Sequence, residues 1–218
     1  MGVLPLKSSR SILLVCIFAI AFAFVESSVV TYLRQAYYPE GFAFPLKPGI
    51  MPLIVVEVTR ELATIVMLAS VAMIAGRTRW QKFSYFLVAF GVWDLFYYVW
   101  LKIILDWPGS LLEWDVLFLI PVPWIGPVIA PVLVSIAMIA GGMLILKKEG
   151  QNEGFHASRT AIALTLGATA LLLYSFMSDL DATIRFHYPK PYLYILLALG
   201  MILYVAAFVL TSIKRKEM

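Results

Sequence analysis

The chain has little charge, one cysteine and two histidines, and each shortage excludes a class of protein. Charged residues make up 14% of the 218 residues, against about 25% in a soluble domain. Cys16 alone excludes an internal disulfide and a cysteine-rich metal site. Neither His156 nor His187 lies in an apolar run, so we expect no haem held between two histidines. Motifs of serine hydrolases, zinc proteases, phosphate-binding loops and dinucleotide-binding domains are also missing.

Hydrophobic residues make up 62% of the chain and occur in long continuous runs. Only helices and closed barrels satisfy their backbone hydrogen bonds in lipid. Barrel strands alternate over about 10 residues, whereas these runs are continuous over about 20 residues, the length of a spanning helix. We therefore predict an all-α polytopic membrane protein in which residues 1–218 form a single six-helix bundle in contact with the lipid bilayer.

Six runs are long enough to span the hydrocarbon core. The predicted spans are 11–33, 50–75, 83–105, 125–146, 160–181 and 192–213. A basic start followed by Ala21-Phe22-Ala23 is also typical of a cleaved signal peptide, but the apolar run continues to Leu33, farther than such a segment needs. We therefore expect a first spanning helix rather than a signal peptide.

Residues 106–124 are the least regular part of the sequence. The apolar stretch from Trp114 to Ile120 is too short to span a membrane, and prolines at 121, 123, 127 and 131 interrupt the residues after it. We predict a short interfacial or re-entrant half-helix between the third and fourth spans. Tryptophans cluster in this region and in the third span, where they are typical of an interfacial belt or of walls around a lipid-like ligand.

Lysine and arginine are distributed unevenly between the two sets of connections. One set, with both termini, contains Lys7, Arg10, Arg77, Arg79, Lys82, Lys147, Lys148, Arg159, Lys214, Arg215 and Lys216. The other set contains Arg34, Lys47, Lys102, Arg185 and Lys190, and Arg60 lies inside a span. Cytoplasmic loops carry the excess of positive residues, so we predict a multi-pass protein of the cell (inner) membrane with cytoplasmic N- and C-termini. This bias explains the net charge of +4 without a nucleic-acid partner.

Three ionisable residues lie in the middle of the second span, in Glu57-Val58-Thr59-Arg60-Glu61. Each costs about 2.5–3.5 kcal/mol near the centre of a bilayer, unless it is paired, protonated or exposed to a wet cavity. Glu57, Arg60 and Glu61 are spaced by three and four residues, so they share one helix face. Arg60 is able to neutralise one carboxylate, which leaves the other to bind a proton or a cation.

Further acids are predicted in the same half of the membrane. Glu26 lies in the first span and Asp94 in the third, where Tyr98 and Lys102 lie on the same face as Asp94. Four buried carboxylates and one guanidinium carry an excess of negative charge, which bound protons or a metal ion would neutralise. Oxygen ligands favour Mg, Ca or Mn, with Glu26, Glu61 and Asp94 as the candidate ligands.

Three functions fit this pattern. The first is a membrane-embedded enzyme acting on a lipid or amphiphilic substrate from the extracytoplasmic side. In that enzyme, Glu61, Asp94 and Glu57 are candidate catalytic residues, and Arg60, Tyr98 and His187 are candidate substrate-binding residues. The second is a non-catalytic subunit or assembly factor that binds other membrane subunits, in which the charges only hold helices together. The third is a small proton- or cation-coupled transporter.

Overall fold

Helices dominate the computed structural model, which describes residues 6–48, 53–150 and 155–213. Within these ranges, six helical segments are long and apolar enough to cross a membrane. They are α1 (Leu6–Tyr37), α2 (Ile54–Ala75), α3 (Arg79–Leu105), α4 (Ile129–Glu149), α5 (Arg159–Met177) with its short continuation α6 (Leu180–Ile184), and α7 (Tyr194–Ser212). The prediction of six spans is therefore confirmed at the level of helix length and composition.

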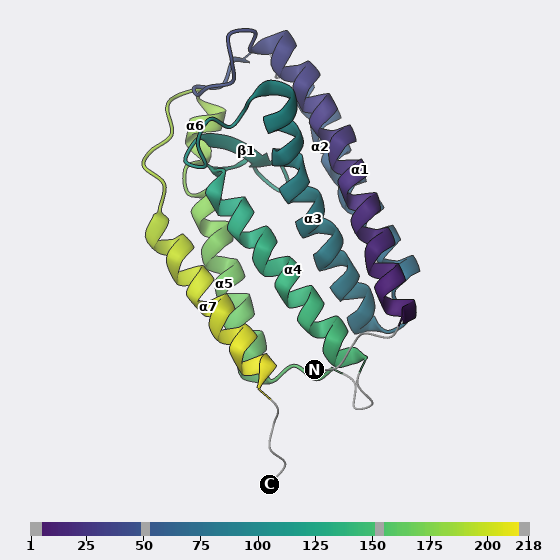
Figure 1. Cartoon of the computed structure of the whole chain (residues 1–218). Helices are drawn as coiled ribbons and strands as arrows, with labels where there is room; N and C mark the ends of the chain where they lie inside the picture. Colours follow the sequence, from purple (N-terminus) through teal and green to yellow (C-terminus); the bar gives the residue numbers. More distant parts are fainter. Residues whose placement is uncertain (1–5, 49–52, 151–154, 214–218) are drawn as a thin grey trace.

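The helices form one bundle in which α1 starts and α7 ends at the same end (Figure 1). Helix α3 is central and packs against α1, α2 and α4, while α5 packs mainly against α7. Apolar side chains from α1, α2, α3 and α4 form the largest buried cluster, which includes Val15, Leu68 and Val88. A second cluster joins α4, α5 and α7 around Leu172 and Phe176.

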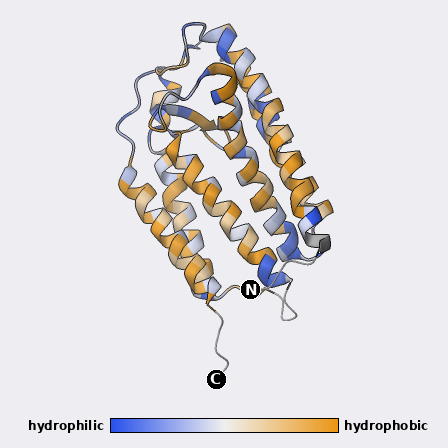
Figure 2. Ribbon diagram, viewed as in Figure 1, coloured by the Kyte–Doolittle hydropathy of each residue, from blue (hydrophilic) through white to orange (hydrophobic). Residues whose placement is uncertain are grey.

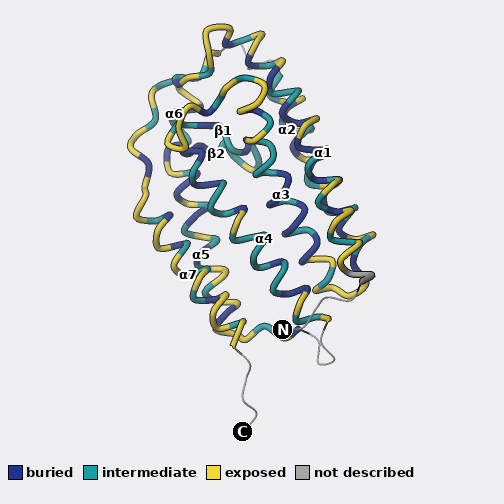
Figure 3. The backbone as a smooth tube through the Cα atoms, viewed as in Figure 1, coloured by how far each residue is buried: buried dark blue, intermediate teal, exposed yellow. Residues whose placement is uncertain are grey.

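The outer surfaces of the helices are apolar along most of their length (Figure 2). Many large hydrophobic side chains face outward, including Ile74, Ile195 and Val55, which are 86%, 76% and 71% exposed. In the burial view the outward sides of the helices are exposed, while buried residues gather between helices (Figure 3). A water-soluble monomer rarely exposes so much contiguous apolar surface, whereas a helix surface in contact with lipid is expected to be apolar.

Three of the differences between the helix boundaries and the predicted spans have a clear local cause or consequence. Helix α1 continues to Tyr37, so Arg34 belongs to the helix and not to the following loop. Helix α3 begins earlier than predicted because Thr78 caps it by accepting the N–H of Gln81 at 3.1 Å. Helix α4 begins later, at Ile129, because residues 124–127 pair as a strand. The predicted start of the second span at residues 50–52 lies outside the described residues.

A β-hairpin occupies the irregular segment between α3 and α4. Strands β1 (Trp114–Phe118) and β2 (Trp124–Pro127) pair antiparallel, with a register shift between Val116 and Phe118. The predicted half-helix is therefore wrong. Aromatic and β-branched residues favour strands, and Pro121 and Pro123 fall in the turn, where no ladder N–H is needed. A short apolar run bounded by turn residues does not by itself distinguish a strand from a helix.

The hairpin is attached to the elements around it at both ends. The carbonyls of Glu113 and Leu111 accept the N–H groups of Val128 and Ile129 at 2.9 and 2.8 Å, which fixes the entry into α4. Ile125 of β2 is buried with Phe44 and Ala182 in a third apolar cluster. Because its backbone is paired and its faces are covered, this non-helical segment meets the condition for irregular backbone inside a membrane protein.

Two glycines allow α3 and α4 to approach closely. A Cβ added at Gly91 of α3 would lie 2.7 Å from the Ser135 carbonyl of α4, and one added at Gly142 would lie 2.8 Å from the Ser84 carbonyl. Small residues at helix crossings are the usual means of close packing in membranes. The close approach at Gly91 brings Ser135 beside Asp94, one turn farther along α3, where the two side chains form a hydrogen bond.

We predict that Gly91→Ala lowers the unfolding free energy by about 1–3 kcal/mol because the added methyl overpacks the α3–α4 contact. Gly141→Ala is the matched control, since a Cβ there meets no atom within 4 Å. The measurement is denaturant unfolding in detergent micelles. Equal unfolding midpoints for the two variants would contradict the close contact.

Candidate functional site

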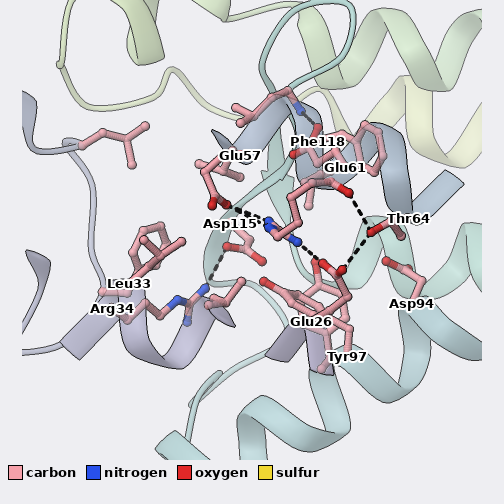
Figure 4. A pocket seen from close by; sticks show the side chains of 18 of the residues that line it. Glu26, Leu33, Arg34, Glu57, Glu61, Thr64, Asp94, Tyr97, Asp115 and Phe118 are labelled. Atoms are coloured by element: carbon pink, nitrogen blue, oxygen red, sulfur yellow. Dashed lines mark hydrogen bonds and ion pairs between the residues drawn. The ribbon is translucent and has the colours of Figure 1, made fainter. Parts of the chain in front are cut away.

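A polar cavity lies at the hairpin end of the bundle, between α1, α2, α3 and β1 (Figure 4). Its volume of about 160 Å³ is similar to that of an engineered cavity of about 150 Å³ that binds benzene. The cavity is lined by Glu26, Val30, Leu33, Arg34, Tyr38, Phe42, Leu46, Ile54, Glu57, Arg60, Glu61, Thr64, Trp93, Asp94, Tyr97, Tyr98, Asp115, Val116, Leu117, Phe118 and Leu119. It has room for the polar group of a small ligand.

Arg60 joins two carboxylates from different helices. Its Nε and Nη2 donate to Oε2 of Glu57 at 3.1 and 2.8 Å, and its Nη1 donates to Oε2 of Glu26 on α1. The other oxygen of Glu26 accepts the hydroxyl proton of Thr64 at 2.8 Å. Glu57 lies in the first turn of α2, where the helix dipole favours a negative charge. All three guanidinium nitrogens of Arg60 are thus engaged by protein carboxylates.

A second ion pair connects α1 to the hairpin. Arg34 Nη2 donates to Asp115 Oδ1 of β1 at 3.0 Å, and both side chains are almost completely buried. The guanidinium of Arg34 also lies 3.7 Å from the ring centroid of Trp107 and 4.3 Å from that of Phe42, a favourable cation–π arrangement. Burial raises the pKa of Asp115, while Arg34 lowers it.

Each member of this second pair has one buried polar atom without a partner. Within residues 6–48, 53–150 and 155–213, neither Arg34 Nη1 nor Asp115 Oδ2 has a hydrogen-bond partner. Unsatisfied buried polar atoms are rare in native structures and each costs about 1–3 kcal/mol. Both residues line the cavity.

Glu61 and Asp94 are bound differently from the other acids in the cavity. Glu61 Oε2 accepts the backbone N–H of Leu119, just after β1, at 2.8 Å. Asp94 Oδ2 accepts the hydroxyl proton of Ser135 at 2.7 Å. In the described part of the chain, neither carboxylate forms an ion pair. These two acids therefore line the cavity held by neutral donors alone.

Acids outnumber bases around the cavity. Five lining residues are Asp or Glu and two are Arg, so the formal charge is −3 (two minus five) with every group ionised. In the described part of the chain, Arg60 donates three hydrogen bonds to Glu26 and Glu57, so its positive charge is already balanced by two carboxylates. The arrangement is suited to a neutral or cationic group.

The structure brings together most of the residues predicted from the sequence. Cavity-lining residues include Glu26, Glu57, Arg60, Glu61, Asp94 and Tyr98. His187 is not among them: its Nε2 lies 3.2 Å from Asp181 and its Nδ1 lies 2.9 Å from the Tyr188 carbonyl. In the described ranges no three His, Cys, Asp or Glu side chains are grouped to hold a metal ion. The metal site predicted at Glu26, Glu61 and Asp94 therefore stays a prediction.

The sequence did not indicate the contributions of Arg34, Asp115 and the Leu119 N–H. The apolar run ends before Arg34, which predicts a loop at that position, and Asp115 lies in the segment predicted as a half-helix. The alternation of a strand over Trp114–Phe118 and the prolines after it would have been the signal for a hairpin. No family model, curated protein or solved structure matches the chain, so the cavity itself is the basis for inferring a function.

We predict that Arg34→Met lowers the unfolding free energy by about 3–5 kcal/mol, because it leaves the Asp115 carboxylate buried without a counter-charge. The double variant Arg34→Met/Asp115→Leu should regain most of this loss, since an apolar pair replaces a buried ion pair at little cost. Denaturant unfolding in micelles measures both.

The control for this prediction is Lys102→Met, which removes an exposed ion pair with Asp106. Exposed pairs contribute little, so this variant should unfold close to wild type. A loss as large as that of Arg34→Met would show that burial is not the cause.

We predict that Asp181→Asn lowers the pKa of His187. Hydrogen bonds to the Tyr188 carbonyl and to Asp181 raise that pKa above its usual range because both ring nitrogens face acceptors. The protonated ring thus stabilises the fold at pH values below the unfolded pKa of about 6.5, and this contribution disappears as the pH rises through the folded pKa. Titration of the histidine NMR signals, assigned with His156→Gln, measures the shift. An unchanged pKa would exclude the contact with Asp181.

Proposed function

We propose that the protein is a membrane-embedded enzyme that uses Glu61 and Asp94 for proton transfer to and from an amphiphilic substrate. One observation carries this proposal. These two acids line the same cavity and have no ionic partner among the described residues, while Glu26, Glu57 and Asp115 in that cavity are each paired with an arginine. Paired carboxylates are fixed as anions, whereas unpaired ones in a cavity are free to exchange a proton.

Acid–base catalysis needs a carboxyl group that is positioned but still has a free oxygen. Glu61 and Asp94 each accept one hydrogen bond, from Leu119 N–H and from the Ser135 hydroxyl, on a single oxygen. That bond orients the carboxyl group and leaves its second oxygen to a ligand in the cavity. Two carboxyl groups in different surroundings commonly divide the roles of acid and base. Glu57, ion-paired with Arg60, fits a supporting role better than a catalytic one.

The chemistry of the cavity supports a substrate with a hydroxyl-bearing polar group. A hydroxyl both donates and accepts hydrogen bonds, so it is able to satisfy Asp115 Oδ2 and Arg34 Nη1 together. Aromatic and aliphatic side chains such as Phe42, Trp93 and Phe118 complete the walls, as is typical of small-molecule sites. Since the exterior of the bundle is apolar, we infer that the substrate reaches the cavity from the membrane as a lipid or a similar amphiphile.

We infer the side of the membrane from the charged ends of the helices. Arg79 begins α3, Arg77 precedes it, and Lys147 and Lys148 lie in the last turn of α4. The start of α3 and the end of α4 lie at the end of the bundle opposite the hairpin (Figure 1). Because positively charged connections stay in the cytoplasm, we place the termini in the cytoplasm and the cavity on the extracytoplasmic side. This orientation corresponds to a multi-pass protein of the cell (inner) membrane.

A non-catalytic role has one observation in its favour. The ion pairs Arg60–Glu26 and Arg34–Asp115 connect α1 to α2 and α1 to β1, as expected for charges that hold a subunit together. These pairs do not involve Glu61 or Asp94, so substitutions at those two acids distinguish the roles. Coupled transport has less support, because below the cavity the helices meet in an apolar cluster around Leu68 and Ala72.

We predict that Glu61→Gln and Asp94→Asn each lower turnover at least about 100-fold, the usual contribution of a general acid or base. Because the proposal specifies a class of substrate, the assay incubates the purified protein in liposomes made from total membrane lipids and follows every lipid species by mass spectrometry. Wild type should convert at least one hydroxyl-bearing species.

The control variant is Glu40→Gln, an exposed acid outside the cavity lining, which should keep wild-type turnover. Unfolding midpoints of all variants show whether the fold is intact. Conversion by Glu61→Gln at the wild-type rate would contradict the proposal. Two results together would favour the subunit role. Well-folded wild type would convert no lipid, and a membrane protein that co-purifies with wild type would be lost in the Arg60→Gln variant.

A further inference from the structure

A second cavity of about 170 Å³ lies between the hairpin, the end of α5 and the segment before α7. It is lined by Trp114, Ile125, Tyr174, Ser175, Ser178, Asp179, Lys190, Pro191, Tyr192 and Leu193. It shares none of these residues with the first cavity. The lining combines three aromatic residues with one carboxylate and one ammonium group, and the proposed enzyme activity uses none of them.

Asp179 is the distinctive residue of this cavity because it is buried and only half satisfied. The residue is 6% exposed. One oxygen, Oδ2, accepts the backbone N–H of Lys190 at 2.6 Å. The other oxygen, Oδ1, is buried and has no hydrogen-bond partner among the residues that the structure describes. A buried carboxylate oxygen without a donor is costly, and Asp179 is one of the residues that line the cavity.

The rest of the lining restricts what that ligand can be. The hydroxyls of Ser175 and Tyr192 bond each other at 2.9 Å, and Ser178 donates to the Ser175 carbonyl, so the neutral polar groups are largely occupied within the protein. Trp114, Tyr174 and Tyr192 offer aromatic rings. Aromatic rings around a carboxylate attract cations, since the ring faces carry negative electrostatic potential. The Lys190 ammonium balances the Asp179 carboxylate in formal charge, so the ring faces and the unpartnered Asp179 Oδ1 are what favour a cation.

We infer that this second cavity binds a primary ammonium group, which donates a hydrogen bond to Asp179 Oδ1 between the aromatic rings of Trp114, Tyr174 and Tyr192. A primary ammonium carries three donors and so satisfies Oδ1, which a quaternary ammonium is unable to do. The exposed side chain of Lys190 lines the same cavity and adds a positive charge suited to a phosphate. The ligand is therefore either a free amine or the zwitterionic ethanolamine head group of a lipid.

The test measures binding to the full-length protein in phosphatidylglycerol nanodiscs by titration calorimetry at pH 7.5. The probes are ethylammonium, tetramethylammonium, short-chain phosphatidylethanolamine and short-chain phosphatidylglycerol. Wild type should bind ethylammonium or phosphatidylethanolamine saturably. Asp179→Asn should weaken that binding about tenfold or more, because it removes a charge-assisted hydrogen bond, yet it keeps an oxygen for the Lys190 N–H.

The matched control is Asp181→Asn. It changes a half-exposed acid two residues away, outside the lining of the cavity. The affinity of this variant for the probes should be within twofold of wild type. If the protein binds phosphatidylethanolamine and not ethylammonium, the ligand is a lipid head group. If it binds ethylammonium and not phosphatidylethanolamine, the ligand is a free amine. Three outcomes overturn the inference: no saturable binding to wild type, equal affinity of wild type and Asp179→Asn, or tetramethylammonium binding as tightly as ethylammonium. None of these depends on the proposed enzyme activity.

Discussion

A charge buried among apolar helices costs several kcal/mol unless an opposite charge lies beside it. Two arginines satisfy this constraint here. Arg60 of α2 binds Glu57 of its own helix and Glu26 of α1, and Arg34 of α1 binds Asp115 of β1. These contacts hold α1, α2 and the hairpin around a common space. The cavity is the space that remains between α1, α2 and the hairpin when these ion pairs hold the three elements together.

The polar contacts of the cavity fall into two kinds. Ionic contacts fix the positions of the walls, whereas Glu61 and Asp94 are held only by Leu119 N–H and the Ser135 hydroxyl. The Ser135 contact depends in turn on the close approach of α3 and α4 at Gly91. A neutral donor orients a carboxyl group without fixing its charge, so the ion-paired residues differ chemically from Glu61 and Asp94 although they share one cavity.

The sequence was sufficient to predict the helices and one face of the site. Long apolar runs have few alternatives in a membrane protein, and the spacing of Glu57, Arg60 and Glu61 places them on one side of α2 in any helix. Glu26, Asp94 and Tyr98 were predicted from depth and helix spacing, and they do line the cavity. The hairpin was not predictable in the same way, because a five-residue apolar strand has the same local pattern as a short helix. The roles of Arg34 and Asp115 depend on that hairpin and on the true end of α1.

The apolar cluster around Leu68, Ala72 and Val88 closes the inner end of the first cavity. A space closed at one end exchanges water, ions and protons with one compartment only. Under the proposed function, any proton that Glu61 or Asp94 releases would therefore return to the solution at the hairpin end of the bundle without crossing this apolar cluster.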